Sequence, residues 1–274
     1  MRRAKRAARR RMPSAALSIP PSALSSMSSE KAAAIVLKVV EFSETSSVVT
    51  LFTREFGKIH ALAKGARRPK GPFESALDLL AHCSIVFLRK SSGTLDLLTE
   101  AKLLRRFRPS GHDLACLYAG YYVAELLTEL TDDYDPHPLL FDLADQTLLG
   151  LAHGENVPRT VLRFEMAALG VLGHLPSLET CAQCGKPVAS SDRVSFGLLA
   201  GGVLCGNCRV GKRQVASISG GALTAMSRLS DLQSVEWEKQ ELEARIRGEL
   251  RGLVGNYIAH LLGHRPKMHE FLQA

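Results

Sequence analysis

Two C-x-x-C pairs constrain what this 274-residue chain can fold into more than any other feature. The pairs are Cys181/Cys184 and Cys205/Cys208, and twenty residues separate the second cysteine from the third. Zn²⁺ prefers four thiolates at the corners of a tetrahedron, and two short cysteine turns joined by a hairpin can supply them. We therefore predict a zinc site. Because four thiolates leave no open coordination position, the ion would organise structure and would not activate water.

Three other uses of these cysteines are weaker alternatives. Disulfides need an oxidising compartment, and no signal peptide with an apolar core is recognisable. A thioredoxin-type redox centre has one C-x-x-C at a helix start instead of a matched pair. Iron in the same thiolate cage stays open as another metal. The segment between the pairs is apolar around a Gly201-Gly202 turn, which predicts a hairpin, and we place the zinc knuckle at residues 178–213.

Charge is distributed unevenly along the chain. The formal net charge is +8, but residues 1–29 contain seven Lys/Arg and no acidic residue. Residues 30–110 have fourteen basic and eight acidic side chains, a net of +6, and residues 111–180 have two and eleven, a net of −9. Residues 181–215 have five and one, a net of +4. Such segregation is typical of a protein that attracts a polyanion, whereas the acidic middle near Asp132, Asp133 and Asp135 is expected to meet protein partners.

Residues 1–29 are rich in Arg, Ala and Ser and lack an apolar pattern, so we expect them to be disordered. Three explanations compete: an organellar transit peptide, a flexible basic arm that adds phosphate affinity, and a misassigned start. We favour the third, with Met27 as the first residue, because a folded domain begins directly after it.

Residues 30–108 are predicted to form an OB-fold β-barrel. Five β-patterned stretches follow one another, at 35–40, 48–53, 58–64, 84–89 and 95–104. A short helix is predicted between the third and fourth strands, at 73–80, where apolar residues recur at helical spacing. That order is expected of an OB-fold, a small barrel whose face binds oligonucleotides.

Residues 111–274 are predicted to form an α-helical domain that carries the inserted four-cysteine zinc knuckle, which makes the fold class α+β. Helical periodicity covers 113–130, 139–151, 158–172, 220–229 and 241–262. No run of eighteen apolar residues exists, so no membrane-spanning segment and no membrane partner are expected.

The densest positive stretch, Lys64-Gly-Ala-Arg-Arg-Pro-Lys-Gly71, leaves the third strand of the predicted barrel. It is not a Walker loop, because no G-K-[ST] follows a spaced glycine. At the rim of a barrel, with cations on neighbouring strands, it predicts a groove that tracks a nucleic-acid backbone. The candidate DNA-binding residues are Arg67, Arg68, Lys70, Lys64, Lys58, Arg54, Arg89, Lys90, Arg105 and Arg106. The aromatic residues available nearby to stack on bases are Phe42, Phe52, Phe56 and Phe73, and for each we favour a place in the core over a stacking platform.

Several stretches together resemble the bacterial RecO family of recombination mediators in DNA repair. They are AIVLKVVEFSETSSVVTLFTREFGKIHALAKGARRPKG, LRFEMAALGVLGHLPSLETCAQCGK, GGVLCGNC and LLGHRPKMHEFL, and the resemblance covers about residues 30 to 270. It implies an OB-fold, a helical domain and an inserted zinc knuckle. It also implies binding of single- and double-stranded DNA and annealing of complementary strands without ATP. Together with RecR, such proteins load RecA on DNA coated by single-stranded DNA-binding protein (SSB).

The same resemblance implies site residues and partners. Arg67, Arg68 and Lys70 correspond to the family's basic barrel element, and the four cysteines correspond to its metal ligands. The implied partners are RecR and the acidic C-terminal tail of SSB, with RecF as a further one, and the implied location is the cytoplasm, at the nucleoid. A tail of that kind needs an apolar hollow beside a cation. We place it on the closing helix, at Leu253, Tyr257, Leu261 and Arg265.

Two other functions compete with a DNA-binding mediator. One is an enzyme with a structural zinc, but the chain has no H-E-x-x-H, no nucleophile elbow and no paired carboxylates at a strand end. The other is an RNA-binding OB-fold protein, which fits the barrel but not the acidic helical middle. We predict that the chain is not an enzyme.

Overall fold

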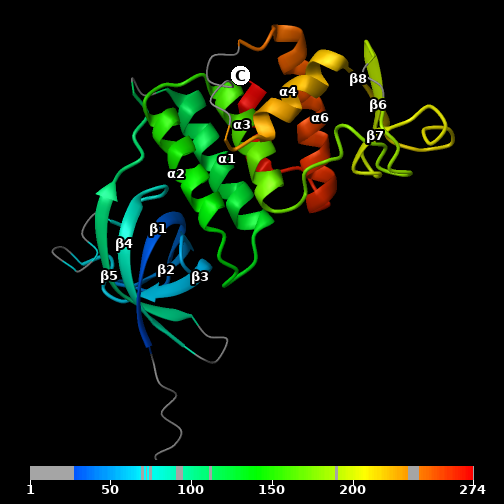
Figure 1. Ribbon diagram of the computed structural model, residues 1–274. Coiled ribbons are helices and arrows are strands. Elements are labelled where there is room, and N and C mark those ends of the chain that lie inside the picture. The colour runs from blue at the N-terminus through cyan, green and yellow to red at the C-terminus, as the bar shows by residue number, and fades with distance from the viewer. Residues whose placement is uncertain are drawn as a thin grey trace, which may run out of the picture.

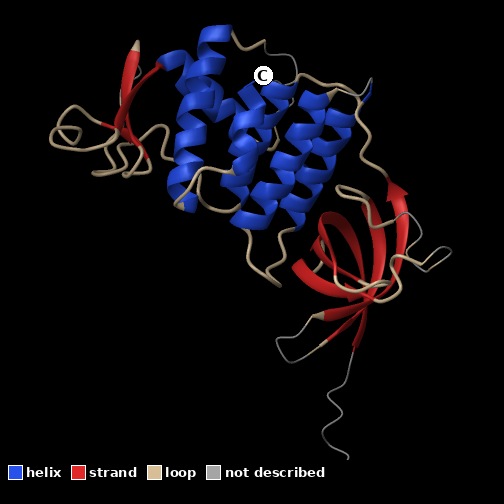
Figure 2. Ribbon diagram, turned by 180° about the vertical axis from the view of Figure 1, so that it is seen from behind, coloured by secondary structure: helices blue, strands red, loops and turns tan. Residues whose placement is uncertain are grey.

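The computed structural model describes residues 28–68, 71, 73, 76–90, 95–110, 113–188, 191–233 and 241–273 of the chain. A sheet of five strands comes first, and helices and a second, smaller sheet follow it. The two sheets lie at opposite ends of the helices (Figure 1), and the view from behind shows the same arrangement (Figure 2). The predicted α+β class is confirmed. Within the described residues, no helix combines the length and apolar character that crossing a membrane requires.

The first five strands close into a barrel in the order β1-β2-β3-β5-β4. They are β1 (Ser28–Glu41), β2 (Ser47–Thr53), β3 (Gly57–Ala63), β4 (His82–Arg89) and β5 (Asp96–Arg105). All neighbouring pairs are antiparallel except β3 and β5, which run parallel. A five-stranded barrel of this kind fits the predicted OB-fold.

β1 is longer than the sequence pattern predicted. Its first residues, Ser28 and Ser29, pair with Arg89 and Leu88 of β4, although both belong to the stretch that the sequence predicts to be disordered. The sequence signal was weak there because serine and charged residues precede the apolar run. The rest of that extension, residues 1–27, lies outside the described residues.

The barrel interior is lined mainly by small aliphatic side chains. β3 alternates strictly, with Ile59, Ala61 and Ala63 buried and the residues between them half-buried. Phe87 of β4 is the largest side chain of this cluster that is completely buried. Small inward residues are consistent with a barrel of only five strands, whose interior leaves little room for side chains.

The helix predicted at 73–80 does not form in the described part of that stretch. Ala76 N–H donates to Phe73 O (3.0 Å), which closes a single turn. Leu80 has a positive φ of 63°, and its N–H donates to Val36 O of β1 (2.8 Å). The apolar spacing that suggested a helix arises because Phe73 and Ala76 both turn into the barrel core.

Helices make up most of the second half of the chain. They are α1 (Leu114–Leu130), α2 (Pro138–Ala152), α3 (Val157–Val171), α4 (Gly220–Ser230), α6 (Ala244–Leu262) and the short 3₁₀ helix η3 (Lys267–Gln273). The five predicted helices are confirmed, with ends displaced by no more than three residues, whereas η3 was not predicted. Asp113 caps α1 by accepting a hydrogen bond from Ala115 N–H (2.8 Å), as expected for an acidic N-cap.

A small sheet in the order β7-β6-β8 interrupts the helices. Its strands are β6 (Arg193–Gly197), β7 (Gly202–Leu204) and β8 (Val215–Ser219). The hairpin predicted around Gly201-Gly202 is confirmed as β6 and β7. β8 was not predicted, because its sequence, Val215–Ser219, shows little apolar alternation. Ile218 and Ser219 are its only fully buried residues. We call residues 177–219 the cysteine module, since both C-x-x-C turns lie in it.

One hydrophobic core runs from the outer face of the barrel through the helices to the small sheet. Ile35 and Leu37 of β1 and Phe52 of β2 are buried in it together with side chains of the helices. The rings of Phe52 and Phe141, the latter on α2, stack with centroids 6.2 Å apart. The outer face of β1 and β2 is therefore covered by the helices.

Opposite charges meet around this apolar contact. Arg54 donates from Nε and Nη2 to the two carboxylate oxygens of Asp142 on α2, at 2.8 and 3.0 Å. Arg105 of β5 pairs with Asp145, one turn further along α2, and His82 Nδ1 lies 2.8 Å from the same carboxylate. The two pairs link the ends of β2 and β5 to one helix.

The loop between α1 and α2 covers the start of β3. The Lys58 side chain is only 11% exposed, and its Nζ donates to the carbonyl oxygens of Thr128 (2.7 Å) and Thr131 (2.6 Å). These carbonyls end α1, where backbone acceptors lack helical partners. Asp133 of the loop lies 3.6 Å from Lys58 Nζ and 3.2 Å from His60 Nε2.

Backbone contacts fix the loop more tightly still. Tyr134 N–H donates to Lys58 O (2.9 Å), and Gly57 has a φ of 69°. A Cβ atom on Gly57 would lie 2.1 Å from the carbonyl oxygen of Asp135. Only glycine satisfies both the left-handed conformation and this close approach.

We predict that Lys58→Ala lowers the free energy of unfolding by about 1–3 kcal/mol, because two carbonyl acceptors at the end of α1 lose their charged donor. The melting temperature, followed by circular dichroism, should fall by several degrees. Lys38→Ala is the matched control, since it removes an exposed lysine from β1. Equal melting temperatures for the two variants would contradict the structural role of Lys58.

Candidate nucleic-acid interface and metal centre

Arg54, Lys58 and Arg105 do not lie in an open groove, which corrects the sequence-based set of DNA-binding residues. Each is engaged with the helical domain through the contacts described above. This interface also explains part of the uneven charge along the chain, because basic residues of the barrel pair with acidic residues of the helices across it. Asp133, one of the acidic residues expected to attract a protein partner, contacts Lys58 and His60 of the chain itself.

Three further predicted cations lie elsewhere on the barrel. The Arg89 guanidinium sits 4.5 Å above the centroid of the Tyr134 ring. Arg106 Nε approaches Asp78 at 3.9 Å, and Lys90 is exposed at the end of β4. None of the three lines the hollow formed by the basic loop after β3.

That hollow opens where β1 and β3 end and β2 begins, and its volume is about 310 Å³. Its lining residues are Phe42, Thr45, Ser46, Leu62, Lys64, Gly65 and Arg68. Arg67 N–H donates to Thr45 O (3.2 Å), which ties the basic loop to the β1–β2 loop. We call this feature the barrel-end hollow. It brings together Lys64 and Arg68 from the predicted set.

The cations of the barrel-end hollow differ in how far they are neutralised. Lys64 and Arg68 are exposed, and neither has a carboxylate within 4.0 Å in the part of the chain that the structure describes. Arg67 Nη1 makes a single contact with Glu41, at 2.9 Å, and the Glu41 side chain is 71% exposed, whereas the pair of Arg54 with Asp142 is bidentate. An exposed pair of this kind contributes little to stability and can be exchanged for another anion. Lys70 lies outside the described residues.

Phe42 is the aromatic residue for which the preferred core position is wrong. Of the four phenylalanines assigned to the core, Phe52 and Phe73 are buried, and Phe56 packs edge-on against Phe87 at 5.4 Å. Phe42 is instead 65% exposed and forms one wall of the barrel-end hollow. The signal was present in its neighbours, because Phe42 stands between Glu41 and Ser43 after the apolar run of β1 has ended.

The four cysteines of the two C-x-x-C turns converge in the cysteine module. All four Sγ atoms lie within 4.8 Å of one another, and those of Cys184 and Cys205 are 3.8 Å apart. Sulfurs about 2.3 Å from one tetrahedral ion would be about 3.8 Å apart, so the cluster fits such an ion. The two turns have the same design, since Gly185 N–H donates to Cys181 O (2.8 Å) and Arg209 N–H donates to Cys205 O (3.1 Å).

The protonation behaviour of the thiols also fits a cation site. The backbone amide of Cys205 hydrogen-bonds to the sulfur of Cys181 and is the main reason why the pKa of that thiol falls to about 6. Shared hydrogen bonds with the sulfurs of Cys205 and Cys184 raise the pKa of Cys208 to about 12. Four sulfurs this close cannot all become thiolates unless a cation compensates their charge, which is what a bound metal ion does.

The predicted partner site on the closing helix is not formed as one surface. Leu253 and Tyr257 are buried, and Tyr257 OH donates to the carbonyl of His174 (3.0 Å). Leu261 and Arg265 are exposed beyond them. The prediction is wrong because the face of α6 that carries Leu253 and Tyr257 packs into the core.

A different hollow, of about 350 Å³, lies between α3, α6 and η3. Its lining residues are Val157, Pro158, Val161, Leu162, Ala244, Arg247, Gly248, Arg251 and Leu272. We call it the helix hollow. It has apolar walls and two guanidinium groups, the combination that an acidic, partly apolar peptide requires.

Buried polar groups hold one of these guanidinium groups in place. Arg251 Nη2 pairs with Glu165, whose side chain is fully buried, and Tyr122 OH donates to the same carboxylate oxygen (2.5 Å). Arg251 Nε and Nη1 are buried and have no hydrogen-bond partner among the described residues. A buried donor without an acceptor is costly, so the ion pair with Glu165 is the main interaction that keeps this guanidinium charged in the wall of the helix hollow.

Comparison with protein-family profiles identifies the family to which the chain belongs. The profile of the recombination protein O N-terminal domain matches residues 27–107, and that of the C-terminal domain matches residues 111–270. The chain belongs to the RecO family. The boundary between the two RecO domains falls between β5 and α1, where the barrel gives way to the helices. Neither matching RecO profile indicates a catalytic family.

Relatives from several bacteria lead to the same family. A DNA repair protein RecO from Rhodopirellula baltica is 42% identical over 263 residues, which cover 87% of this chain and 97% of the relative. The Myxococcus xanthus protein of the same name is 35% identical, covering 87% and 95%. That of Anaeromyxobacter dehalogenans strain 2CP-C is 34% identical, covering 88% and 95%. The similarity thus extends over both RecO domains.

Proposed function

We propose that this RecO-family protein binds DNA at the barrel-end hollow and anneals complementary strands without ATP. Together with RecR it would help to load RecA on DNA coated by SSB. The observation that carries the proposal is the meeting of Phe42, Lys64 and Arg68 at the open end of an OB-type barrel. Cations there would hold phosphates, and the exposed ring would stack on a base, as in single-strand binding by barrels of this class.

Annealing follows from binding if the protein lowers the repulsion between two backbones. That step breaks no covalent bond, so it needs neither a nucleophile nor a nucleotide. RecR, with RecF as a further partner, is proposed on family membership alone. DNA as the ligand places the proposed site of action at the nucleoid, in the cytoplasm.

We predict that Lys64→Ala/Arg68→Ala reduces the salt dependence of single-strand binding. If each cation neutralises one phosphate, the slope of log K against log salt should fall by about 1.4. Phe42→Ala should weaken binding by about 1–3 kcal/mol without changing that slope, because stacking releases no counterions. Fluorescence anisotropy across a salt series measures both effects.

A charge-matched control for these variants is Arg228→Ala/Arg245→Ala, which removes two exposed cations from α4 and α6. An unchanged slope in Lys64→Ala/Arg68→Ala would remove DNA from the barrel-end hollow. The same assays with RNA decide between the mediator and an RNA-binding OB-fold protein, since tighter binding of RNA than of DNA would favour the latter. A requirement for ATP in annealing would favour an enzyme with a structural zinc.

We propose that the metal of the cysteine module is Zn²⁺ and that it is structural. Cys181, Cys184, Cys205 and Cys208 would hold it, and no ligand position is left for water. Bound zinc would fix the two turns relative to the small sheet.

We predict one zinc per chain by elemental analysis, and none in Cys208→Ser. Structural zinc contributes on the order of 10 kcal/mol to the folding of small knuckles, so the variant should lose the module's protection from proteolysis. Cys116→Ala, which changes a buried cysteine of α1, is the control and should keep its metal. A folded, protease-resistant native preparation without zinc would contradict this assignment.

We propose that the helix hollow takes the acidic C-terminal tail of SSB. A carboxylate of the tail would pair with Arg247, Arg251 would add positive charge to the wall, and an apolar side chain would contact Val161 and Leu272. This location replaces the one on the exposed end of α6.

We predict that Arg247→Ala weakens binding of a synthetic SSB-tail peptide about tenfold, the loss expected for one charge-assisted contact. Arg265→Ala serves as the control and should bind the peptide like the unmodified protein. Fluorescence anisotropy of a labelled peptide gives both affinities. Normal binding in Arg247→Ala with weakened binding in Arg265→Ala would return the site to the exposed end of α6.

A further inference from the structure

The cysteine module carries a cluster of cations that the chain itself does not neutralise. Within residues 181–215 the basic side chains are Lys186, Arg193, Arg209, Lys212 and Arg213, and Asp192 is the single acid. Arg193 pairs with Glu249 of α6 at 3.1 Å. The other four have no carboxylate within 4.0 Å in the described ranges of the chain. Barrel cations such as Arg54 and Arg105, in contrast, are paired across the interface with the helices.

The positive charge of the four cations exceeds the charge needed to neutralise the metal centre. Four thiolates and one Zn²⁺ have a net charge of about −2, and backbone amides already point at the sulfurs. Two cations would therefore balance the centre. All four are exposed, and their positive charge faces solvent.

Two of these side chains, Arg209 and Lys212, border a third hollow, of about 340 Å³, between the second cysteine turn and the small sheet. Its lining residues are Ser195, Arg209, Val210, Lys212, Val215, Ala216 and Ser217. Lys212 Nζ donates to Gln183 of the first cysteine turn (2.8 Å), which spreads the positive charge over both turns. Hydroxyl donors and two cations around an open hollow suit the oxygens of a phosphate backbone.

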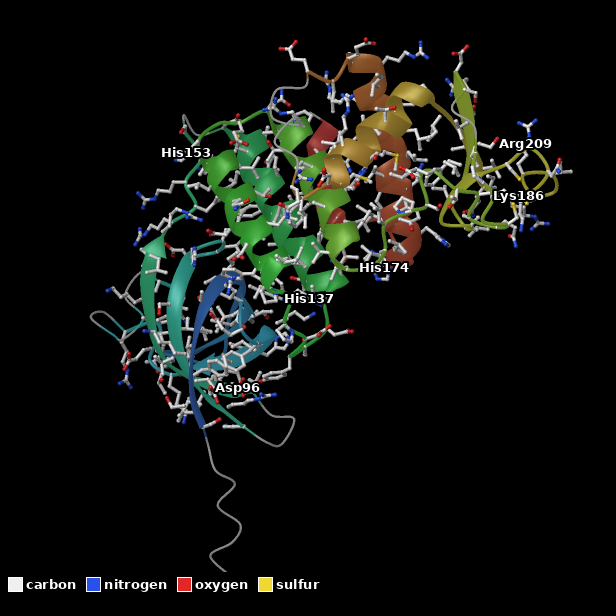
Figure 3. All side chains as sticks on the ribbon, in the orientation of Figure 1. Asp96, His137, His153, His174, Lys186 and Arg209 are labelled. Carbon is white, nitrogen blue, oxygen red and sulfur yellow. The ribbon has the colours of Figure 1, made fainter. Side chains whose placement is uncertain are left out.

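The placement of Arg209 depends on the metal turns. It follows Cys208 directly, and its N–H donates to Cys205 O. In Figure 3 the labelled Arg209 and Lys186 both lie on the loops of the cysteine module, far from the labelled Asp96 in the barrel. The module and the barrel are separated by the helices in both ribbon views (Figures 1 and 2).

We propose that the cysteine module is a second nucleic-acid site, which holds the phosphate backbone of another strand while the barrel-end hollow holds the first. The proposal rests on the proposed function, because that function supplies the polyanion. Exposed cations without an aromatic residue in the lining indicate backbone contact without base recognition. A second strand held on the same molecule is present at a high effective concentration near the first, which would speed annealing without adding affinity at the barrel.

The test compares two variants of the module with the zinc-loaded full chain. Arg209→Ala/Lys212→Ala alters the hollow, and Lys186→Ala/Arg213→Ala removes two exposed cations whose side chains make no hydrogen bond or ion pair with the described residues. The second variant keeps the test valid if the first loses zinc, and elemental analysis monitors both. The charge-matched control is again Arg228→Ala/Arg245→Ala.

The probe is an oligonucleotide of about 12 nucleotides, short enough to occupy one site. At low salt the unmodified protein should bind two copies per chain by equilibrium titration, and each module variant should lose or weaken the second while the first keeps its affinity within about twofold. The annealing rate should fall about fivefold or more in the module variants. Lys64→Ala/Arg68→Ala should have the opposite pattern, losing the tighter site.

Two results would overturn the proposal. In one, both zinc-loaded module variants bind two oligonucleotides and anneal at the normal rate, so the cations only balance the metal centre. In the other, the unmodified protein binds a single oligonucleotide, at the barrel. Either result leaves the proposed function intact, whereas failure of the unmodified protein to bind DNA at all would overturn the proposed function itself.

Discussion

Burial of the outer face of β1 and β2 against the helices determines which parts of the barrel stay open to a ligand. Ile35, Leu37 and Phe52 belong to the core of the helical domain as much as to the barrel. Charged pairs such as Arg54 with Asp142 surround them. These pairs engage several basic barrel residues, which are then not available to bind a polyanion. What remains open is the end of the barrel where the β1–β2 loop and the loop after β3 meet, and Phe42, Lys64 and Arg68 lie there.

The helical domain keeps the remaining features apart. The barrel-end hollow, the helix hollow and the cysteine module lie on different elements, so DNA, an acidic peptide and a metal ion would not compete for the same residues. Arg251 illustrates the separation. Its charge is tied to buried Glu165 in the core, and it faces a hollow with apolar walls, a setting that favours a carboxylate on an apolar peptide over a hydrated DNA backbone.

Sequence reasoning succeeded where a local rule fixes the outcome. The spacing of the cysteines was sufficient to predict that four sulfurs converge, and helical periodicity located the helices because long amphipathic segments repeat the signal many times. It failed where tertiary contacts determine the environment of a residue. Lys58 and Arg54 are equally basic in the sequence whether they face solvent or a helix, and only the fold reveals that they face a helix. The stretch 73–80 has helical spacing, yet Phe73 and Ala76 turn into the barrel core without a helix in the described part of the stretch.

The close approach of Gly57 to the carbonyl of Asp135 has an evolutionary consequence. A side chain on that glycine would displace the α1–α2 loop and, with it, the hydrogen bonds that Lys58 makes to the end of α1. The start of β3 and residues 131–137 therefore have to change together in evolution, although some seventy positions of the chain separate them. A chimera that takes its barrel from one relative and its helices from another would have to carry this loop with the barrel. The boundary along which the protein can be recombined thus differs from the boundary between its two domains.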